Sequence, residues 1–577
     1  MLFKDAGTAP RLPAARLLAA SALALVAACS DNDDEDAASP GAPAPTPAPT
    51  PAPTPSPTVS GVSLASIGVF QTGVFDDGAA EIVAFDPSTN QAFVVNSAAT
   101  TVDVLDLTTP SAPVLAQRID ASVVDGAPAG GANSIAVANG LVAVALEAPV
   151  AQDPGRVAFF DSTTFDFLGA VTVGPLPDMV TFTPDGATLL VANEGEPADD
   201  LSVDPEGSVS LVTGFFSAGT GVVDVSAATV ATADFTAFNG QEDALNAAGV
   251  RVFIPGASAA QDFEPEFIAV APDGATAFVS LQENNAFAVL DIGGAEIVDV
   301  ISFGVKDHSL LGNELDASDE DAGINIVNQP VFGYFQPDAI AAYEVGGETF
   351  IVTANEGDSR DFGVFSEEAR VGDLLLDLTA FPDAAMLQAP GNLGRLEVTN
   401  AFGDTDGDGD FDQLFSFGGR SFAIFRPDGT LVFDSGSDLE DITAAVLPLE
   451  FNSDNDENGS FDSRSDDAGP EPEGVAVGQL EDQFFAFVGL ERVGGIAIFD
   501  VTDPTAPTFE DYVNVRDFNV AAEAAPDVTN PAVGDLGPEG LAFVAPADSP
   551  TGAPLLIVGN EVSGTTRIFE VTFTTTP

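Results

Sequence analysis

The sequence predicts an all-β fold, a seven-bladed β-propeller with long loop insertions, and three observations support this prediction. A short pattern of a turn residue, an acid and an apolar strand recurs seven times along the 577 residues. Each copy is followed by an apolar strand that ends in a polar pair, and in most copies by a third strand. No long amphipathic helix is evident, and β-branched residues, Phe and Gly dominate, as sheets prefer. A repeat of about 40–50 residues with three or four short strands has the size of a propeller blade.

The first 28 residues predict an export signal. Lys4, Arg11 and Arg16 precede the apolar run LLAASALALVAAC, which is too short for a comfortable membrane span. Residues 25–29, LVAAC, resemble the lipobox of bacterial lipoproteins, which implies cleavage before Cys29 and a diacylglycerol on its sulfur. The alternative is an ordinary signal peptide with an incidental cysteine.

Residues 29–58 predict a disordered linker that holds a folded domain away from a membrane. The segment SDNDDED is followed by alternating Pro with Ala or Thr, which favours extended polyproline II and builds no core. We therefore expect a protein that is lipid-anchored in the bacterial cell envelope. Ser30 stands where inner-membrane retention is associated with an aspartate, which favours the outer membrane. The folded domain is predicted to run from residue 59 to residue 577.

The two recurring patterns place acids at equivalent points of successive blades. The first pattern includes PDMVTF and PEGVAV, with NSIAV at Ser134 as a variant, and its acids are Glu81, Asp178, Glu266, Asp338, Glu473 and Glu539. The polar pairs that end the second strands contribute Glu194, Glu283, Glu356, Glu491 and Glu561. Turns such as TPDG at 183–186 and APDG at 271–274 join the first two strands, as tight hairpins require. We call these two sets of acids the channel-mouth acids.

In a propeller the first strand of each blade lines the central channel, so we expect the channel-mouth acids to meet around one end of it. Like charges so close raise one another's pKa or require a cation. The alternative is architectural, because blade repeats also carry polar residues that cap backbone amides. Residues 62–70, VSLASIGVF, are expected to supply the outer strand of the last blade and to close the ring.

The spacing of the first pattern predicts loop insertions at about 195–262 and 357–470. The second insertion holds DTDGDGDFD at 404–412, which matches the first nine positions of a calcium loop, although its twelfth position is Phe415 rather than Glu. A second version is DNDENGSFD at 454–462. A solvated acidic turn is the alternative in both places. The predicted Ca²⁺ ligands are Asp404, Asp406, Asp408, Asp410, Asp412, Asp454, Asp456, Asn458 and Asp462.

The composition excludes several classes of function. The chain has 90 acidic and 16 basic residues, a net charge of -74, so nucleic acid is not a partner. The charge favours cations, high salt or a basic partner, with solubility alone as the alternative. Cys29 and His308 are the only residues of their kinds, which excludes thiolate and two-histidine metal sites. Arg360, Arg464 and Arg492 could hold an anionic group beside a cation, or could pair with neighbouring acids.

Three longer strings give a family resemblance. LPDMVTFTPDGATLLVANEGEP, QPDAIAAYEVGGETFIVTANEGDSRDF and RSDDAGPEPEGVAV resemble the bacterial choice-of-anchor I family, over residues 62–573 or so. The resemblance implies an extracellular β-propeller related to surface-glycoprotein and YVTN-type repeat domains, displayed by various anchors. Some relatives carry phosphatase-like names, and phytase-type propellers use calcium clusters at an acidic mouth. No catalytic set can be carried over residue by residue.

Two functions follow as hypotheses, and the sequence leaves open whether the protein is an enzyme. The favoured one is a calcium-dependent surface module that binds a ligand, glycan or protein. The alternative is a calcium-dependent phosphoesterase, alkaline phosphatase- or phytase-like, acting on a phosphoester at the channel mouth with metal-bound water. Its candidate catalytic residues are Glu473, Glu356, Glu539, Arg360 and Arg464.

Overall fold

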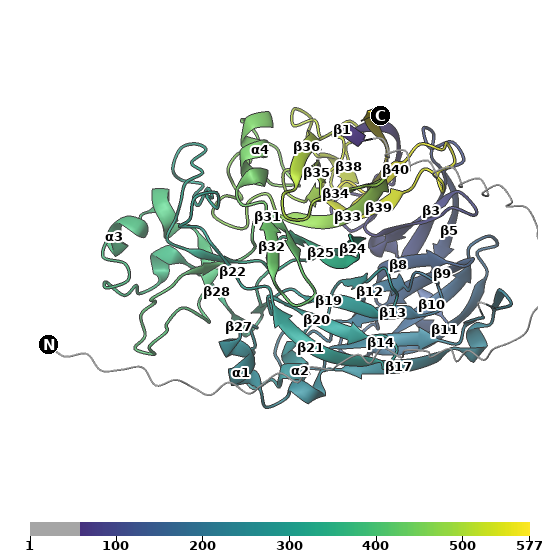
Figure 1. Cartoon of the computed structure of the whole chain (residues 1–577), viewed down its shortest axis with the longest axis horizontal. Helices are drawn as coiled ribbons and strands as arrows, with labels where there is room; N and C mark the ends of the chain where they lie inside the picture. Colours follow the sequence, from purple (N-terminus) through teal and green to yellow (C-terminus); the bar gives the residue numbers. More distant parts are fainter. Residues whose placement is uncertain (1–57, 218, 577) are drawn as a thin grey trace, which may run out of the picture. The chain divides into compact units, whose positions relative to one another are not determined.

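The structure, a computed structural model, describes residues 58–217 and 219–576 (Figure 1). The predicted signal peptide, Cys29 and nearly all of the predicted linker lie outside the described residues. Within the described part of the chain, no helix has the length and apolar character needed to cross a membrane.

The described domain is built around seven four-stranded antiparallel sheets, and all but the last take their strands in chain order. The first four are β2 (Val83–Asp86), β3 (Gln91–Asn96), β4 (Thr101–Asp106) and β5 (Val114–Asp120); β8 (Ala132–Ala138), β9 (Leu141–Leu146), β10 (Pro154–Asp161) and β11 (Phe167–Pro175); β12 (Pro177–Phe182), β13 (Leu189–Asn193), β14 (Ser208–Thr213) and β17 (Thr229–Asp234); and β18 (Ile268–Val270), β19 (Thr276–Leu281), β20 (Ala286–Asp291) and β21 (Glu296–Ser302). The last three are β24 (Ile340–Val345), β25 (Glu348–Asn355), β31 (Ser421–Phe425) and β32 (Leu431–Asp434); β33 (Pro472–Leu480), β34 (Gln483–Leu490), β35 (Ile496–Asp500) and β36 (Thr508–Val513); and β39 (Pro538–Val544), β40 (Leu555–Asn560), β41 (Thr565–Thr576) and β1 (Thr58–Gln71).

The first strands of these sheets contact one another in cyclic order, from β2 through β8, β12, β18, β24 and β33 to β39 and back to β2. Such a ring of radial sheets is a β-propeller, so the predicted fold class is confirmed. The outermost strand of the last sheet is β1, which pairs antiparallel with β41 from Thr58 opposite Thr576 to Gln71 opposite Thr565. The predicted closure of the ring by an N-terminal strand is therefore confirmed.

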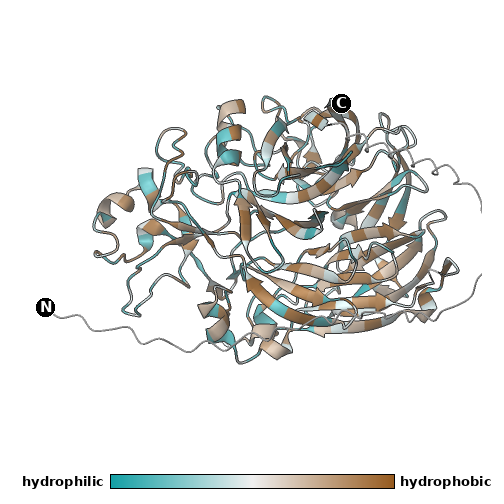
Figure 2. Cartoon of the chain, in the orientation of Figure 1, coloured by the Kyte–Doolittle hydropathy of each residue, from teal (hydrophilic) through white to brown (hydrophobic). Residues whose placement is uncertain are grey.

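The core is divided among the interfaces between neighbouring sheets, and apolar stretches run along the strands (Figure 2). Each of the seven interfaces has its own buried apolar cluster. At the point of ring closure, Val94 of β3 and Ile557 of β40 belong to one such cluster. Burial between sheets, rather than within one, therefore stabilises the ring as a whole.

The predicted turns are present. The backbone N–H of Gly186 donates to Thr183 O over 2.7 Å, and that of Gly274 donates to Ala271 O over 2.8 Å. Both glycines have positive φ, 65° and 68°, which explains why glycine ends each turn.

The two expected insertions differ from the structure in one respect. The range 195–262 contains β14 and β17, and the range 357–470 contains β31 and β32, so both ranges include the third and fourth strands of a sheet. In both sheets a long loop separates the second strand from the third. The regular spacing of strands along the sequence therefore does not reveal the third and fourth strands.

The remaining elements lie in the connections. The small strands are β6 (Val123–Val124), β7 (Ala127–Pro128), β15 (Phe216–Ser217), β16 (Val222–Val223), β22 (Val305–Asp307), β23 (Phe332–Tyr334), β26 (Asp361–Phe362), β27 (Phe365–Ser366), β28 (Glu368–Arg370), β29 (Glu397–Thr399), β30 (Phe415–Ser416), β37 (Glu523–Ala525) and β38 (Val528–Thr529). The helices are α1 (Glu242–Ala247), α2 (Ala259–Asp262), α3 (Ala384–Leu387), α4 (Asp438–Val446), and the short η1 (Ser97–Ala99), η2 (Val225–Ala227), η3 (Thr236–Phe238), η4 (Val371–Asp373) and η5 (Pro390–Gly394). Leu315, Leu393 and Val398 belong to a separate small core in these connections.

Glycine in the PEG copies of the first pattern allows neighbouring inner strands to approach closely. A Cβ at Gly474 of β33 would collide with the backbone oxygen of Glu539 in β39. We expect Gly474→Ala to lower the free energy of unfolding by about 1–3 kcal/mol, since the obstacle is backbone and cannot swing aside. Denaturant unfolding measures this change. Gly219→Ala, where a Cβ meets no atom within 4 Å, is the control. Equal stability of the two variants would contradict the close packing.

Candidate functional site

The channel contains a cavity of about 480 Å³ whose lining includes residues at or next to the start of all seven inner strands. Its wall combines polar and apolar groups, with Ile135, Val180 and Leu541 among the lining residues. The carboxylates of Asp178, Asp338 and Glu539 also line it. The structure therefore brings together acids that are up to hundreds of residues apart in sequence.

A bulge at the start of several inner strands positions the acid of the first pattern. In β12, Pro177 lies opposite Asn193 whereas Val180 lies opposite Val191, so two residues, Asp178 among them, oppose one. The same shift occurs between Pro472 and Val475 and between Pro538 and Leu541. Because a bulge breaks the strand alternation, it re-aims a side chain that would otherwise follow the sheet. The recurring turn residue and acid therefore mark the position of this bulge in the sequence.

The two members of the polar pair have different roles. Asn193, Asn355 and Asn560 are buried and bind the neighbouring strand. The Nδ2 of Asn193 donates to Ser210 Oγ over 2.9 Å, and that of Asn560 donates to Thr565 O over 3.1 Å. The asparagines of the polar pairs therefore have a structural role, which was the alternative to ligand binding. The glutamates that follow them belong to the channel mouth.

The channel-mouth acids interact electrostatically across the ring. Burial raises the pKa of Glu81 to about 8, with Ser97 lowering it by a hydrogen bond and Glu561 and Asp178 adding to the increase. Burial raises the pKa of Asp178 to about 6 and that of Asp338 to about 7. Burial first, and neighbouring carboxylates second, raise the pKa of a further set well above the usual range: Glu194, Glu266, Glu356, Glu473 and Glu539. A cation bound among these acids would favour their ionised forms.

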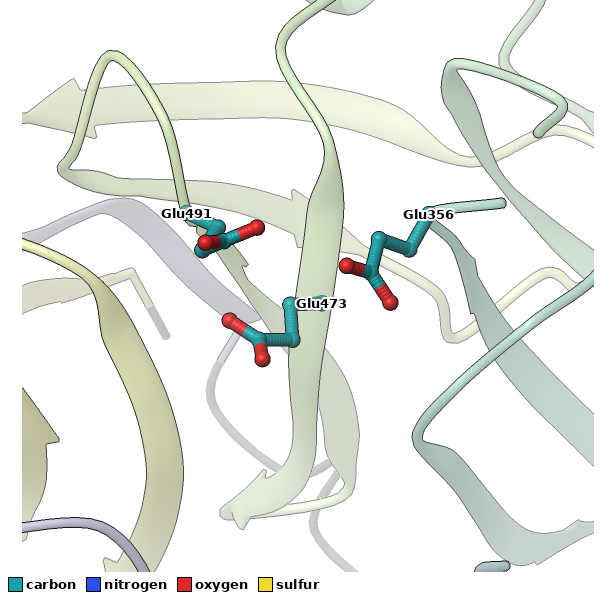
Figure 3. A group of neighbouring side chains, drawn as sticks. All are labelled: Glu356, Glu473 and Glu491. Carbon is teal, nitrogen blue, oxygen red and sulfur yellow. The ribbon is translucent and has the colours of Figure 1, made fainter. Parts of the chain in front are cut away.

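Glu356, Glu473 and Glu491 form the tightest group at the mouth. Glu356 follows β25, Glu473 lies in β33 and Glu491 follows β34. Each offers one carboxylate oxygen, and these oxygens lie within 4.8 Å of one another. Figure 3 shows the three carboxylates turned toward one space between the strands. This arrangement suits a single hard cation with oxygen ligands.

Arg360 is enclosed by acids rather than presented to the channel. Its guanidinium lies 2.6 Å from Glu264 Oε1, 3.7 Å from Asp262 Oδ1 and 3.9 Å from Glu283 Oε2, and its side chain is only 1% exposed. Of the two predicted roles of Arg360, pairing with neighbouring acids is the one that the structure supports.

Arg464 and Arg492 both contact Glu471. Arg464 Nη2 lies 2.6 Å from Glu471 Oε1, and Arg492 Nε lies 2.5 Å from Glu471 Oε2. Arg492 also reaches Glu491 Oε1 over 2.9 Å, which places it beside the group of three glutamates.

Glu264 and Glu471 are two further acids beside the channel-mouth acids, and the sequence did not predict their role. Each is the first acid of an E-P-E motif, at 264–266 and 471–473, whose last acid is a channel-mouth acid. Each pairs with an arginine, Glu264 with Arg360 and Glu471 with Arg464 and Arg492. The repeated E-P-E motif is the signal that could have identified them.

The two predicted calcium loops differ in the structure. In the first, oxygens of Asp404, Asp406 and Asp412 lie within 4.8 Å of one another on the surface, while Asp408 and Asp410 stand outside this group. In the second, within the part of the chain that the structure describes, Asp454, Asp456 and Asp462 form no such group.

Side chains of the second loop are instead engaged by hydrogen bonds. Asn458 Nδ2 donates to Val520 O over 2.6 Å, and Asp462 Oδ1 accepts from Ser465 over 2.6 Å. Asn455 Nδ2 reaches the channel mouth and donates to Glu491 Oε1 over 2.8 Å.

Two known proteins are similar to parts of this chain in sequence. The chain is 34% identical to Gigasin-3a of Magallana gigas over 186 residues, 31% of this chain and 64% of that protein. It is 30% identical to the Mesenchyme-specific cell surface glycoprotein of Strongylocentrotus purpuratus over 254 residues, 37% of this chain and 32% of that protein. The chain thus spans less than two thirds of the length of either relative.

Similar solved structures include Kuenenia stuttgartiensis hydrazine synthase, at a TM-score of 0.41 and 13% identity, covering 88% of this chain and 97% of that one. Another is the Cps50 (Swd1) beta-propeller domain of Myceliophteria thermophila, at a TM-score of 0.38 and 10% identity, covering 88% of this chain and 100% of that one. These likenesses concern the fold and carry no information about activity.

The model of one family, the choice-of-anchor I domain, matches residues 81–504. This range begins at the first channel-mouth acid and includes the first five sheets and three strands of the sixth, β33, β34 and β35. The chain belongs to the choice-of-anchor I domain family.

Proposed function

We propose that this protein is a calcium-dependent binding module of the bacterial cell envelope, held by a lipid on Cys29. The family membership, the similarity to a protein named a cell surface glycoprotein, and the export signal followed by a Pro-rich linker support this location. A domain on such a linker can reach a ligand outside the membrane, as a surface binding module requires.

The approach of channel-mouth acids from different sheets is the observation that carries the proposal, because Asp178, Asp338 and Glu539 line one cavity and Glu356, Glu473 and Glu491 form one group. Carboxylates in a low-dielectric channel attract positive charge and concentrate it there. A cation bound among them offsets their mutual repulsion and orders the mouth, which then presents one defined surface to a partner. The calcium dependence follows from this role of the ion.

The phosphoesterase alternative shares the cation but also needs a positive side chain for the phosphate. Of its candidate residues, Arg360 is enclosed by carboxylates and Arg464 is paired with Glu471, which favours the binding module. Turnover of a generic phosphomonoester that requires Ca²⁺ and is lost in Glu473→Gln would establish the alternative instead.

We expect Ca²⁺ to raise the Tm of the chelator-treated protein. A ligand that binds only the folded state stabilises it by about 2.7 kcal/mol at one hundred times its Kd. Differential scanning calorimetry with Ca²⁺, and with Na⁺ at matched ionic strength, measures the difference. A Tm that is the same with Ca²⁺ and with chelator would contradict the calcium dependence of both candidate functions.

A further inference from the structure

We propose that Glu356, Glu473 and Glu491 together form one divalent-cation site for Ca²⁺, with Gln282 and Asn455 as positioning residues. This inference rests on the proposed function and assigns its ion to three of the channel-mouth acids. It also gives the second acidic loop a role that the sequence did not predict, which is to orient a ligand of the ion through Asn455.

The spacing of the three carboxylates fits one calcium ion. Oxygens bound to the same Ca²⁺ lie about 2.3–2.6 Å from it, so any two of them are at most about 5 Å apart. The nearest oxygens of Glu356, Glu473 and Glu491 satisfy this limit, since all lie within 4.8 Å of one another. The three residues come from different strands and loops, so the propeller itself holds them in place.

Glu356 and Glu491 each have one carboxylate oxygen that accepts a hydrogen bond from a neighbouring side-chain amide. Gln282 Nε2 donates to Glu356 Oε2 over 3.0 Å, and Asn455 Nδ2 donates to Glu491 Oε1 over 2.8 Å. Arg492 contacts the same oxygen of Glu491. Groups that orient the ligands of a metal in this way are typical of protein metal sites.

Two other oxygens of this group are buried and lack hydrogen-bond partners among the described residues. Glu491 is 4% exposed, and its Oε2 has no hydrogen-bond partner there. The same holds for Glu473 Oε2. A buried polar atom without a partner carries a desolvation cost of about 1–3 kcal/mol, more when it is charged. An ion bound between these carboxylates, which Figure 3 shows as neighbours, would satisfy both atoms.

Charge and ligand chemistry favour Ca²⁺. In the described part of the chain, Glu356 and Glu473 make no ion pair with Lys or Arg, since Arg464 and Arg492 are engaged by Glu471 and Glu491. All donors are oxygens, which hard cations prefer, and carboxylates on separate strands suit the flexible coordination of Ca²⁺ better than the strict octahedron of Mg²⁺.

Calcium binds the ionised form of a carboxylate. Binding is therefore expected to release protons and to strengthen as the pH rises.

Isothermal titration calorimetry of the chelator-treated protein with CaCl₂, in two buffers of different ionisation enthalpy, tests the assignment. We expect the wild-type protein to bind Ca²⁺ with proton release. Glu473→Gln and Glu491→Gln should weaken that binding at least tenfold, and Asn455→Ala should weaken it about tenfold through loss of orientation. Asp404→Asn in the exposed loop and Glu481→Gln in an exposed turn are the matched controls and should leave it unchanged.

Two results would overturn the assignment. Wild-type affinity and proton release in Glu473→Gln, Glu491→Gln and Asn455→Ala would place the ion elsewhere in the channel and leave the proposed function standing. Loss of binding in Asp404→Asn alone would place it in the loop. A wild-type protein that binds no Ca²⁺ would instead reject the calcium dependence itself. If the glutamine variants fail to fold, Asn455→Ala and Asp404→Asn still decide between the two places.

Discussion

Replacing Arg360 with methionine is expected to lower the free energy of unfolding by about 3–5 kcal/mol, among the largest effects of any single substitution in this chain. The guanidinium is enclosed with the carboxylates of Asp262, Glu264 and Glu283 and also donates to Asp262 O over 2.6 Å. Methionine fills a similar volume but leaves these acids without their positive partner in a buried setting. Denaturant unfolding of both proteins measures the loss.

The exposed pair of Arg426 with Glu348 provides the control. These side chains are 37% and 61% exposed, so Arg426→Met should change stability by less than about 1 kcal/mol. An Arg360→Met protein as stable as the wild type, but unable to bind an anionic ligand, would show that the arginine serves a ligand rather than the fold.

The protein without Ca²⁺ is expected to lose stability as the pH rises from 5 to 8. Burial raises the pKa of Asp178 to about 6, of Asp338 to about 7 and of Glu81 to about 8, whereas in the unfolded chain these groups titrate near 4. Between the two values the folded state binds more protons than the unfolded state, so stability falls with pH. Each such group contributes ~1.4 kcal/mol per pH unit across its window, which gives a loss of several kcal/mol.

Unfolding free energies measured at pH 5, 6, 7 and 8 in chelator test this expectation. Saturating Ca²⁺ should reduce the slope, because the ion replaces protons at the neighbouring carboxylates of Glu356, Glu473 and Glu491. Glu473→Gln should reduce the slope in chelator, since an amide does not titrate, whereas Glu481→Gln in an exposed turn should not. Stability that is constant or rising over this range in chelator would mean that the acids are hydrated rather than enclosed.

The recurring patterns predicted the ring because the same residue types occupy equivalent positions at the start of successive inner strands. The acid of PDMVTF and that of PEGVAV sit at the same bulge of equivalent inner strands, β12 and β33. The N-terminal strand was predictable because a closed ring of sheets needs a last outer strand, which residues 62–70 could supply. The limits of the insertions were not predictable, because the long connection before β31 removes the regular spacing.

The sequence did not predict which acids pair with the arginines. Arg360 stands in NEGDSRDF directly after a channel-mouth acid, yet its partners Asp262 and Glu264 belong to the connection that precedes the fourth sheet. Nothing in the local pattern states which of 90 acids approaches a given arginine. The second acidic loop is a similar case, because its spacing suggests an ion of its own while Asn455 is directed to Glu491.

The sequence by itself determined the propeller, the closure of the ring and the presence of acids at the channel mouth, because strand periodicity, turn chemistry and repetition are local properties of the chain. Only the tertiary structure decided which carboxylates share one space, which are neutralised by arginine and which asparagines fasten strands. Those outcomes depend on distances and burial between residues from different sheets, and local sequence does not encode either quantity.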